Sequence, residues 1–191
     1  MEAIKKVLFP KGSVPVDTEI QPLLNKWTIK KTVKRFDFLI QKGVRESHLY
    51  FIAKGTLRIY YVSNDTQICV GFGYPHTLIC SYPSFVSNQP SDYYIQALTD
   101  TQLVGISRTD FYACIHQSWN LERHWRQMTE QALLGRIERE TDLVTYAPKE
   151  RLDRLFNRSP HLFQLFPHKY IASYLRMTPE TLSRMLRKSK S

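Results

Sequence analysis

The spacing of hydrophobic residues changes along the chain, and each spacing predicts a different kind of element. Between about Lys31 and Thr109, apolar and polar residues alternate, which is typical of antiparallel strands. Gly55 marks a turn, after which Leu57, Ile59 and Tyr61 alternate with Arg58, Tyr60 and Val62. Further turn signals at 64–65, 74–75, 89–90 and 100–101 have the spacing of a barrel or sandwich of short strands.

From Asn120 the period lengthens and predicts one helix of about 25 residues with two apolar stripes. The first stripe contains Leu121, Trp125, Met128 and Ala132, and the second contains Leu134, Ile137, Thr141 and Val144. We expect one stripe to pack on the strands and the other on a twin subunit; burial of both within a single chain is the alternative. Gly135 in mid-helix costs about 1 kcal/mol against Ala, which favours a close helix approach.

After a break at Tyr146-Ala147-Pro148, where a new helix should start, residues 168–188 predict two short helices joined by a tight turn. Ile171, Ala172 and Leu175 form the apolar side of the first helix. Thr178 can cap the second, and Pro179 suits its first position because its missing N–H would be unpaired there. On the second helix Leu182, Met185 and Leu186 lie on one side, and Glu180, Ser183, Arg184 and Arg187 lie on the other. The pattern is that of a helix-turn-helix, or of a plain αα-hairpin with a solvated charged face.

The excess of positive charge is concentrated at the C-terminal end. Residues 146–191 contain ten Lys and Arg against three Asp and Glu, a net charge of +7 out of +10 for the whole chain. Such a surface attracts a phosphate backbone through counterion release, and it could also attract an anionic membrane. Charge by itself does not choose between these partners.

Size and composition limit the class of protein. With 191 residues, 42% of them hydrophobic, the chain can bury a core and hold one domain plus a small second one. No apolar run is long enough to span a bilayer and residues 1–11 lack a signal-like core, so we expect a cytoplasmic protein outside the membrane. Cys69, Cys80 and Cys114 lack CxxC spacing and are expected in the core.

A β-roll, a long helix and a C-terminal helix-turn-helix, in this order, resemble the Crp/Fnr family of bacterial transcription regulators. The segments KGVRESHLYFIAKGTLRIYYV and IASYLRMTPETLSRMLRK carry the likeness, the second being close to the IASYLGITPETLSR pattern of one branch. The resemblance implies an α+β fold, with a cyclic nucleotide-binding-like jelly-roll sensor domain at 1–118, a dimerisation helix at 119–147 and a small all-α helix-turn-helix domain at 148–191. It also implies a homodimer with double-stranded DNA as its partner and RNA polymerase as a further one.

By the same resemblance, the helix that Thr178 starts would enter the major groove of DNA. Glu180 and Arg184 would contact bases, with Thr181 and Ser183 nearby for bases or phosphates. The remaining basic residues would contact phosphates, namely Lys169, Arg187, Lys188 and Lys190. Arg can bond guanine through two donors and Glu can accept from cytosine, each contact discriminating by about 1–3 kcal/mol. Twofold symmetry predicts a palindromic operator with half-sites about 34 Å apart.

Two departures from the family pattern bear on DNA affinity. The turn has Arg176 where the family usually has Gly, so a left-handed backbone there would cost of the order of 1 kcal/mol. The sequence ends four residues after Arg187, so the β wing of many members is expected to be absent. The second hypothesis is therefore a ligand-binding or protein-interaction module of the same architecture that has lost specific DNA recognition. An enzyme is a distant third, because no nucleophile elbow, P-loop or metal-ligand motif is present.

Cyclic-nucleotide-binding relatives hold their ligand with a Gly-Glu pair and an Arg-Ser pair. Alignment back from Tyr93 places Cys80-Ser81 and Ser91-Asp92 at these positions, so every polar anchor is replaced. Asp92 would repel a cyclic phosphate, and we expect no binding of cyclic AMP or cyclic GMP in the usual way. An aromatic cavity remains, filled by its own side chains or open to an uncharged effector of unknown identity. The candidate pocket residues are Phe72, Tyr74, Cys80, Ser81, Tyr82, Ser91, Asp92 and Tyr93, with Phe85 and Tyr94 beside them.

No metal or other cofactor is expected. Iron–sulfur sensing needs four thiolates, and the chain has three cysteines. The histidines show no HxH or HExxH spacing and are expected at the surface or in the core; they are His48, His76, His116, His124, His161 and His168. A haem bound through His76 has no further support.

Overall fold

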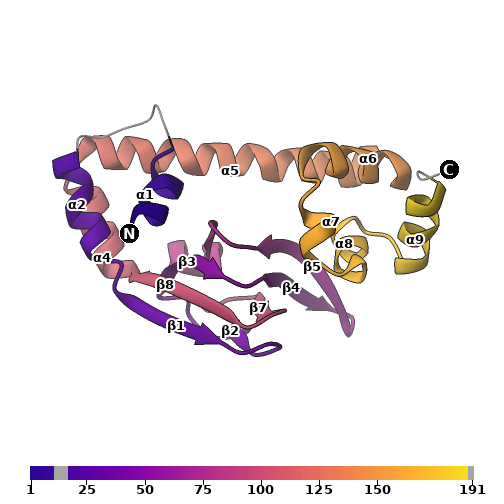
Figure 1. The fold of residues 1–191 in the computed structure, drawn as a ribbon, viewed down its shortest axis with the longest axis horizontal. Helices are drawn as coiled ribbons and strands as arrows, with labels where there is room; N and C mark the ends of the chain where they lie inside the picture. The colour runs from indigo at the N-terminus through magenta and orange to yellow at the C-terminus, as the bar shows by residue number, and fades with distance from the viewer. Residues whose placement is uncertain (11–16, 189–191) are drawn as a thin grey trace. The chain divides into compact units, whose positions relative to one another are not determined.

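The structure, a computed structural model, describes residues 1–10 and 17–188, with the side chains of Asp17 and Lys188 outside the description (Figure 1). Its contacts divide the chain into two compact units. The first comprises residues 1–59 and 72–130, and the second comprises residues 60–71 and the chain from residue 131 onward.

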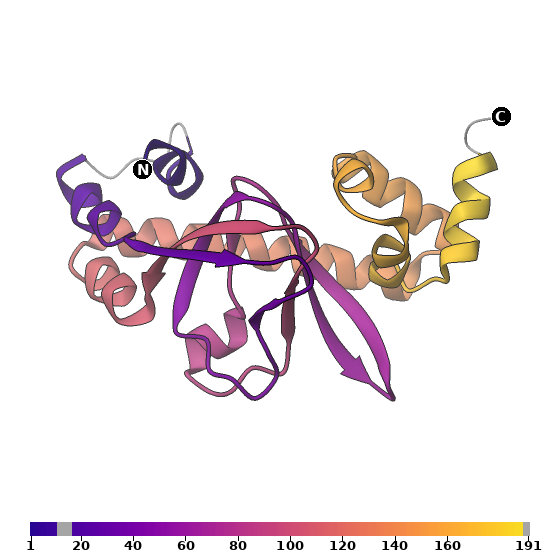
Figure 2. The ribbon, with the colours of Figure 1, turned by 60° about the horizontal axis from the view of Figure 1, so that its bottom comes forward.

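Two four-stranded antiparallel sheets form the β-roll. The first sheet has the order β1 (Ile29–Val33), β8 (Thr101–Ser107), β3 (His48–Lys54) and β6 (Leu78–Ile79). The second has the order β2 (Phe38–Ile40), β7 (Tyr94–Ala97), β4 (Leu57–Ser63) and β5 (Thr66–Gly73). Strands β1 and β8 run side by side (Figure 2), and their antiparallel register places Ile29 opposite Gly105. The predicted α+β class, with an antiparallel β-roll followed by a long helix and a helical head, is confirmed.

Gly55 is at a turn, as predicted, and its φ of 94° is in the left-handed region. A Cβ at this position would lie 2.6 Å from the Asp100 carbonyl oxygen, so glycine is needed there for space as well as for φ. The turn joins β3 to β4, which belong to different sheets. It therefore carries the chain from one sheet to the other.

The strict alternation predicted along β4 is wrong in one respect, because both faces of the strand are covered. Leu57 lies in the core at 0% exposure, but Arg58 and Tyr60 on the other face are only 7% and 3% exposed. The Arg58 guanidinium donates to Gln96 Oε1 at 2.7 and 3.0 Å, so a charged side chain is buried with its partner.

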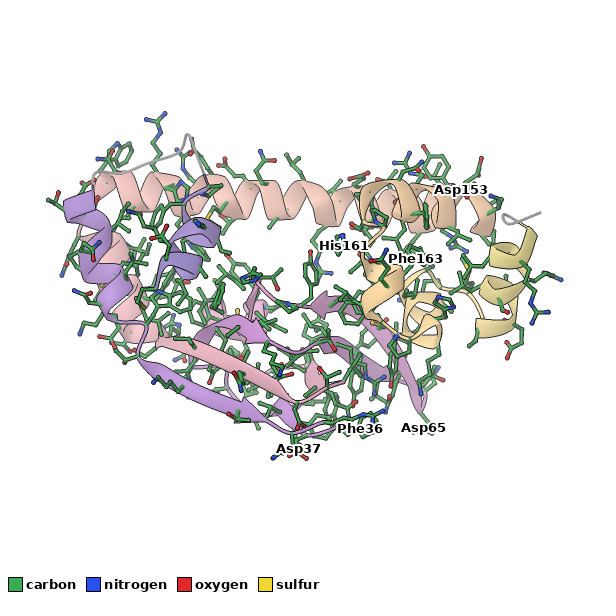
Figure 3. All side chains as sticks on the ribbon, in the orientation of Figure 1. Phe36, Asp37, Asp65, Asp153, His161 and Phe163 are labelled. Carbon is green, nitrogen blue, oxygen red and sulfur yellow. The ribbon has the colours of Figure 1, made fainter. Side chains whose placement is uncertain are left out.

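Strands β4 and β5 are joined by a two-residue turn, as the sequence predicts. Asn64 and Asp65 have φ values of 46° and 57°. Two successive positive φ values are what a two-residue hairpin turn of type I′ requires. Asp65 is labelled at the tip of the hairpin in Figure 3. The outer part of this hairpin, residues 60–71, belongs to the second compact unit.

Four short helices accompany the roll: α1 (Glu2–Leu8), α2 (Asp17–Asn25), α3 (Tyr82–Ser87) and α4 (Arg108–His116). Ile4, Leu23 and Phe111 join one buried cluster with residues of β3 and β8. His124 lies in this cluster region, where its Nε2 hydrogen-bonds to the Leu8 carbonyl and its ring stacks on Phe9 at 4.8 Å. His124 is thus a core histidine, as expected.

The long helix α5 (Trp119–Thr145) has its two predicted stripes in different environments. Leu121 is 2% exposed and packs, with Trp125, in the core of the roll. In contrast, Leu134, Ile137 and Val144 of the second stripe are 57%, 49% and 83% exposed. The explanation of Gly135 by a close helix approach is wrong within this chain, because a Cβ there would have nothing within 4 Å.

The C-terminal head is helical over its described residues, with α6 (Pro148–Arg158), α7 (Leu162–Leu165), α8 (His168–Tyr174) and α9 (Pro179–Lys188). Pro148 begins α6 as predicted, and the Glu150 carboxylate accepts a hydrogen bond from Ala147 N–H at its start. Asp142 of α5 is 4% exposed and accepts from Arg154 at 2.6 Å and Arg158 at 3.2 Å, which ties α5 to α6. Among the described helices, none is long and apolar enough to cross a membrane.

Candidate functional site

The turn between α8 and α9 has the geometry that the sequence analysis anticipated. Arg176 has a φ of 56°, which is left-handed. Met177 N–H donates to the Ala172 carbonyl at 3.0 Å, and Arg176 N–H donates to the Ser173 carbonyl at 3.1 Å. These two bonds form a Schellman motif with arginine at the position that usually holds glycine, so α8 ends here at a steric cost.

The start of α9 is capped as predicted. Thr178 Oγ1 accepts from Thr181 N–H at 3.2 Å, and Pro179 is the first helical residue. The Glu180 pKa is lowered by hydrogen bonds from its own backbone N–H and from the Thr178 hydroxyl. Glu180 is therefore held as an ionised acceptor at the positive end of the helix dipole.

One side of the helix pair is packed and the other faces solvent. Ile171, Ala172 and Leu182 are fully buried at 0% exposure. The exposed side includes Glu180 and Arg184. The other predicted DNA-binding residues are found as follows: Arg187 exposed, Thr181 and Ser183 half-buried on α9, Thr178 exposed at its cap, and Lys169 exposed on α8. The Lys188 side chain and Lys190 lie outside the described residues.

This exposed side combines chemistry that suits a DNA groove. Arg184 presents a planar set of donors, and Glu180 presents an acceptor one turn away. Lys169 lies at the flank with its Nζ 4.9 Å from the centre of the Tyr170 ring. Donors and an acceptor on a helix of this width can contact base edges, and flanking cations can contact phosphates.

The candidate ligand pocket contains a closed pair of hydroxyl groups. Ser81 and Ser91 are each 2% exposed, and their Oγ atoms are 2.7 Å apart. Tyr93 N–H donates to Ser91 Oγ at 3.0 Å. The structure thus brings together Ser81, from the pair at the family's Gly-Glu positions, and Ser91, from the pair at its Arg-Ser positions. Their hydroxyl groups are hydrogen-bonded to each other.

A buried carboxylate that the sequence analysis missed lies beside this pair. Glu46 is 3% exposed and accepts hydrogen bonds from Ser81 N–H at 3.3 Å and His48 N–H at 3.1 Å. Burial raises its pKa. The one available signal was an acidic residue two positions before the start of β3. An ionised acid at this place disfavours an incoming phosphate.

The other candidate pocket residues are spread around this network. Phe72 lies on β5 and Tyr74 directly after it, both half-buried, while Cys80 is buried next to Ser81 with the pKa of its thiol raised by burial. Tyr82 and Asp92 are exposed. Within the described residues, no three His, Cys, Asp or Glu side chains are grouped to hold a metal ion.

Comparison with known proteins gives one family match. Residues 30–118 match the cyclic nucleotide-binding domain family. No curated protein sequence matches the chain.

Several solved structures share the fold over most of the chain. FixK2 from Bradyrhizobium japonicum has a TM-score of 0.71 at 16% identity, covering 84% of this chain and 83% of its own. A CooA variant from Carboxydothermus hydrogenoformans has a TM-score of 0.70 at 16% identity, covering 93% and 87%. The catabolite activator protein of Thermus thermophilus has a TM-score of 0.59 at 19% identity, covering 95% and 85%. Residues 30–118 therefore match the cyclic nucleotide-binding domain family, and the chain has the fold of these solved structures, which it shares with a protein from Eubacterium rectale described as a putative transcriptional regulator of the Crp/Fnr family, at a TM-score of 0.69 and 16% identity, covering 96% of this chain and 87% of that one.

Proposed function

We propose that this chain is a sequence-specific DNA-binding transcription regulator that acts as a homodimer on a palindromic operator. The observation that carries the proposal is the solvent-exposed side of α9, where Glu180 and Arg184 project from a helix capped by Thr178. Arg184 bonds guanine and Glu180 accepts from cytosine, with Thr181 and Ser183 beside them. The cations contact phosphates and fix the register: Lys169, Arg187 and Lys188.

A second copy of the chain covers the exposed stripe of α5. The stripe residues 134, 137, 141 and 144 are spaced by three, four and three, which is the repeat of a two-stranded coiled coil. Leu134 and Ile137, about half exposed in one chain, would be buried against the same residues of the twin. Twofold symmetry then directs the two copies of α9 to half-sites about 34 Å apart.

The regulator does not respond to cyclic AMP or cyclic GMP in this proposal. Ser81 and Ser91, which stand among the family's Gly-Glu and Arg-Ser positions, hydrogen-bond to each other through their hydroxyl groups. The Glu46 carboxylate accepts from Ser81 N–H and so places an acid beside them. A cyclic phosphate would have to displace these bonds and would meet like charge. Isothermal titration should show no binding of cyclic AMP or cyclic GMP at micromolar concentrations, and a micromolar dissociation constant would contradict this part.

The remaining parts of the proposal follow the resemblance. The sensor domain spans 1–118, the dimerisation helix 119–147 and the DNA-binding domain 148–191. RNA polymerase is a further partner, the location is cytoplasmic, and the chain is not an enzyme. Its effector, if it has one, is an uncharged molecule.

The test is binding of the purified protein to a labelled pool of duplex DNA over a range of salt concentrations. The logarithm of the binding constant should fall linearly with the logarithm of salt concentration, and Arg187→Ala should reduce that slope by about 0.9, one phosphate contact. Vesicles of anionic lipid are the comparison for a membrane partner. Binding to vesicles but not to DNA would contradict the proposal and identify a membrane partner. Binding to neither would contradict it as well and favour the ligand-binding or protein-interaction module.

A further inference from the structure

Strand β5 is the last strand of its sheet, so one edge of it carries backbone groups without a neighbouring strand. Part of this edge is occupied by a side chain of the helix-turn-helix. Ser173 Oγ of α8 accepts from Cys69 N–H at 3.0 Å and donates to the Gln67 carbonyl at 3.4 Å. Cys69 is 1% exposed, so its N–H would be buried without this partner if the Ser173 hydroxyl were removed.

The turn of the helix-turn-helix makes a second contact with the same hairpin. Arg176 donates from Nη2 to the Tyr61 hydroxyl of β4 at 2.9 Å. Its backbone is left-handed, which glycine would adopt without steric cost. The side chain at this strained position therefore forms a contact that glycine could not make.

Helix α5 completes the arrangement. Arg136 donates to the Val70 carbonyl of β5 at 2.9 Å. Arg139 donates to the Tyr174 carbonyl at 3.0 Å, and its guanidinium lies 4.2 Å from the centre of the Tyr174 ring. The hairpin, α5 and the end of α8 are thus tied together, in agreement with the grouping of residues 60–71 with the head in one compact unit.

These contacts leave the proposed DNA-reading surface free. Glu180, Arg184 and Arg187 are exposed, and none of them takes part in the bonds to the hairpin. A head held in this way can still meet a DNA groove. Holding it lowers the conformational entropy lost on binding.

We propose that Tyr61, Ser173 and Arg176 are positioning residues, through which the β4–β5 hairpin holds the helix-turn-helix ready for DNA. The inference rests on the proposed function. It assigns to Arg176 a role different from a phosphate contact, and it makes a segment of the β-roll part of the DNA-binding machinery.

The test uses Tyr61→Phe and Ser173→Ala in the full chain, which remove one hydroxyl each without touching α9. Each should weaken binding to a DNA duplex selected by the unaltered chain about 3- to 10-fold, the effect of one hydrogen bond. The slope of binding against salt should stay unchanged, because no phosphate contact is lost. The matched controls are Tyr112→Phe on α4 and Ser63→Ala in the exposed part of the hairpin, which should leave binding unchanged.

Arg176→Gly provides an independent variant, since it relieves the left-handed strain and cannot fail by misfolding the turn. It should also weaken DNA binding while the slope of binding against salt stays unchanged. Arg176→Lys, which keeps a hydrogen-bond donor, should restore part of the affinity. A slope lowered by about 0.9 in Arg176→Gly would identify a phosphate contact and overturn the assignment. Unchanged or tighter binding by Tyr61→Phe and Ser173→Ala would overturn it as well.

Hydrogen exchange separates failure of this inference from failure of the proposed function. The Cys69 amide should exchange faster in Ser173→Ala than in the unaltered chain, whether or not DNA is bound. If the unaltered chain binds no DNA, the proposed function fails and the positioning role fails with it, even where the amide is protected. If it binds DNA and the amide exchanges equally fast in both proteins, the hairpin contact alone is refuted.

Discussion

At the scale of single residues, a buried carboxylate lies beside Ser81 and Ser91, the positions at which relatives hold a cyclic nucleotide. Glu46 is 3% exposed, and the backbone N–H groups of His48 and Ser81 donate to it. Burial raises its pKa by more than these bonds lower it. The ionised form is therefore less favourable in the folded chain than in water. Whenever Glu46 is ionised, it repels a phosphate placed beside it.

The pH dependence of stability follows from the raised pKa of Glu46. Because this pKa in the folded chain exceeds the ordinary 4.5, the folded chain holds the proton more tightly than the unfolded chain. The unaltered protein should lose stability, relative to Glu46→Gln, as pH rises from about 4.5 to the raised pKa, by about 1.4 kcal/mol for each pH unit between the two values. Urea unfolding of both proteins across this range measures the difference. A difference that stays flat, or that grows in favour of the unaltered protein, would contradict the account.

At the scale of elements, α5 has one side packed on its own chain and another in solvent. Leu121 and Trp125 pack in the core of the roll, and Arg136 and Arg139 bond to the hairpin and to α8. The stripe that includes Leu134 and Ile137 has no such cover in one chain. Exposed apolar residues at coiled-coil spacing are the structural basis for the proposed dimer.

Charges placed on this stripe should separate the subunits. Leu134→Lys combined with Ile137→Lys puts four like charges across the twofold axis, so we expect a monomer at micromolar concentrations where the unaltered chain is a dimer. Sedimentation velocity measures the change. Gln131→Lys adds one positive charge per chain at an exposed position outside the stripe and should leave the dimer intact. Dimers in both variants would show that the subunits meet elsewhere.

Gly135 offers a separate test of the same helix. Within its chain a Cβ at this position meets nothing within 4 Å, so Gly135→Ala should raise the free energy of unfolding by about 1 kcal/mol through helix propensity. Chemical denaturation at constant protein concentration is the measurement. Destabilisation would mean that a partner helix passes close to Gly135, as the sequence suggested.

At the scale of the whole molecule, periodicity and local signals were enough for the order of parts. The change of period at Asn120, the proline at 148 and the cap at Thr178 predicted α5, α6 and α9 with starts within one residue of those found. The resemblance to the family, which usually has Gly at this place in the turn, raised a left-handed backbone at Arg176, and the structure has one. These features depend on neighbouring residues, which is why sequence alone reveals them.

Contacts between distant segments could not be predicted in this way. Ser81 and Glu46 are 35 residues apart, and Cys69 and Ser173 are 104 residues apart. A hydrophobic period shows which side of an element is buried, but it does not show what covers that side. The closed serine pair with its buried acid, and the attachment of the hairpin to the head, therefore emerged only from the structure.

The central claim is that the exposed side of α9 reads a DNA sequence. The most direct test is selection of bound fragments from a random duplex library by the unaltered protein and by Arg184→Ala, with Arg123→Ala on α5 as the control for loss of an exposed arginine. We predict a palindrome with half-sites about 34 Å apart, unchanged in the control, and in Arg184→Ala a loss of preference at one position of each half-site, of about 10- to 100-fold. Salt-sensitive binding by the unaltered protein with no enriched sequence would contradict the claim.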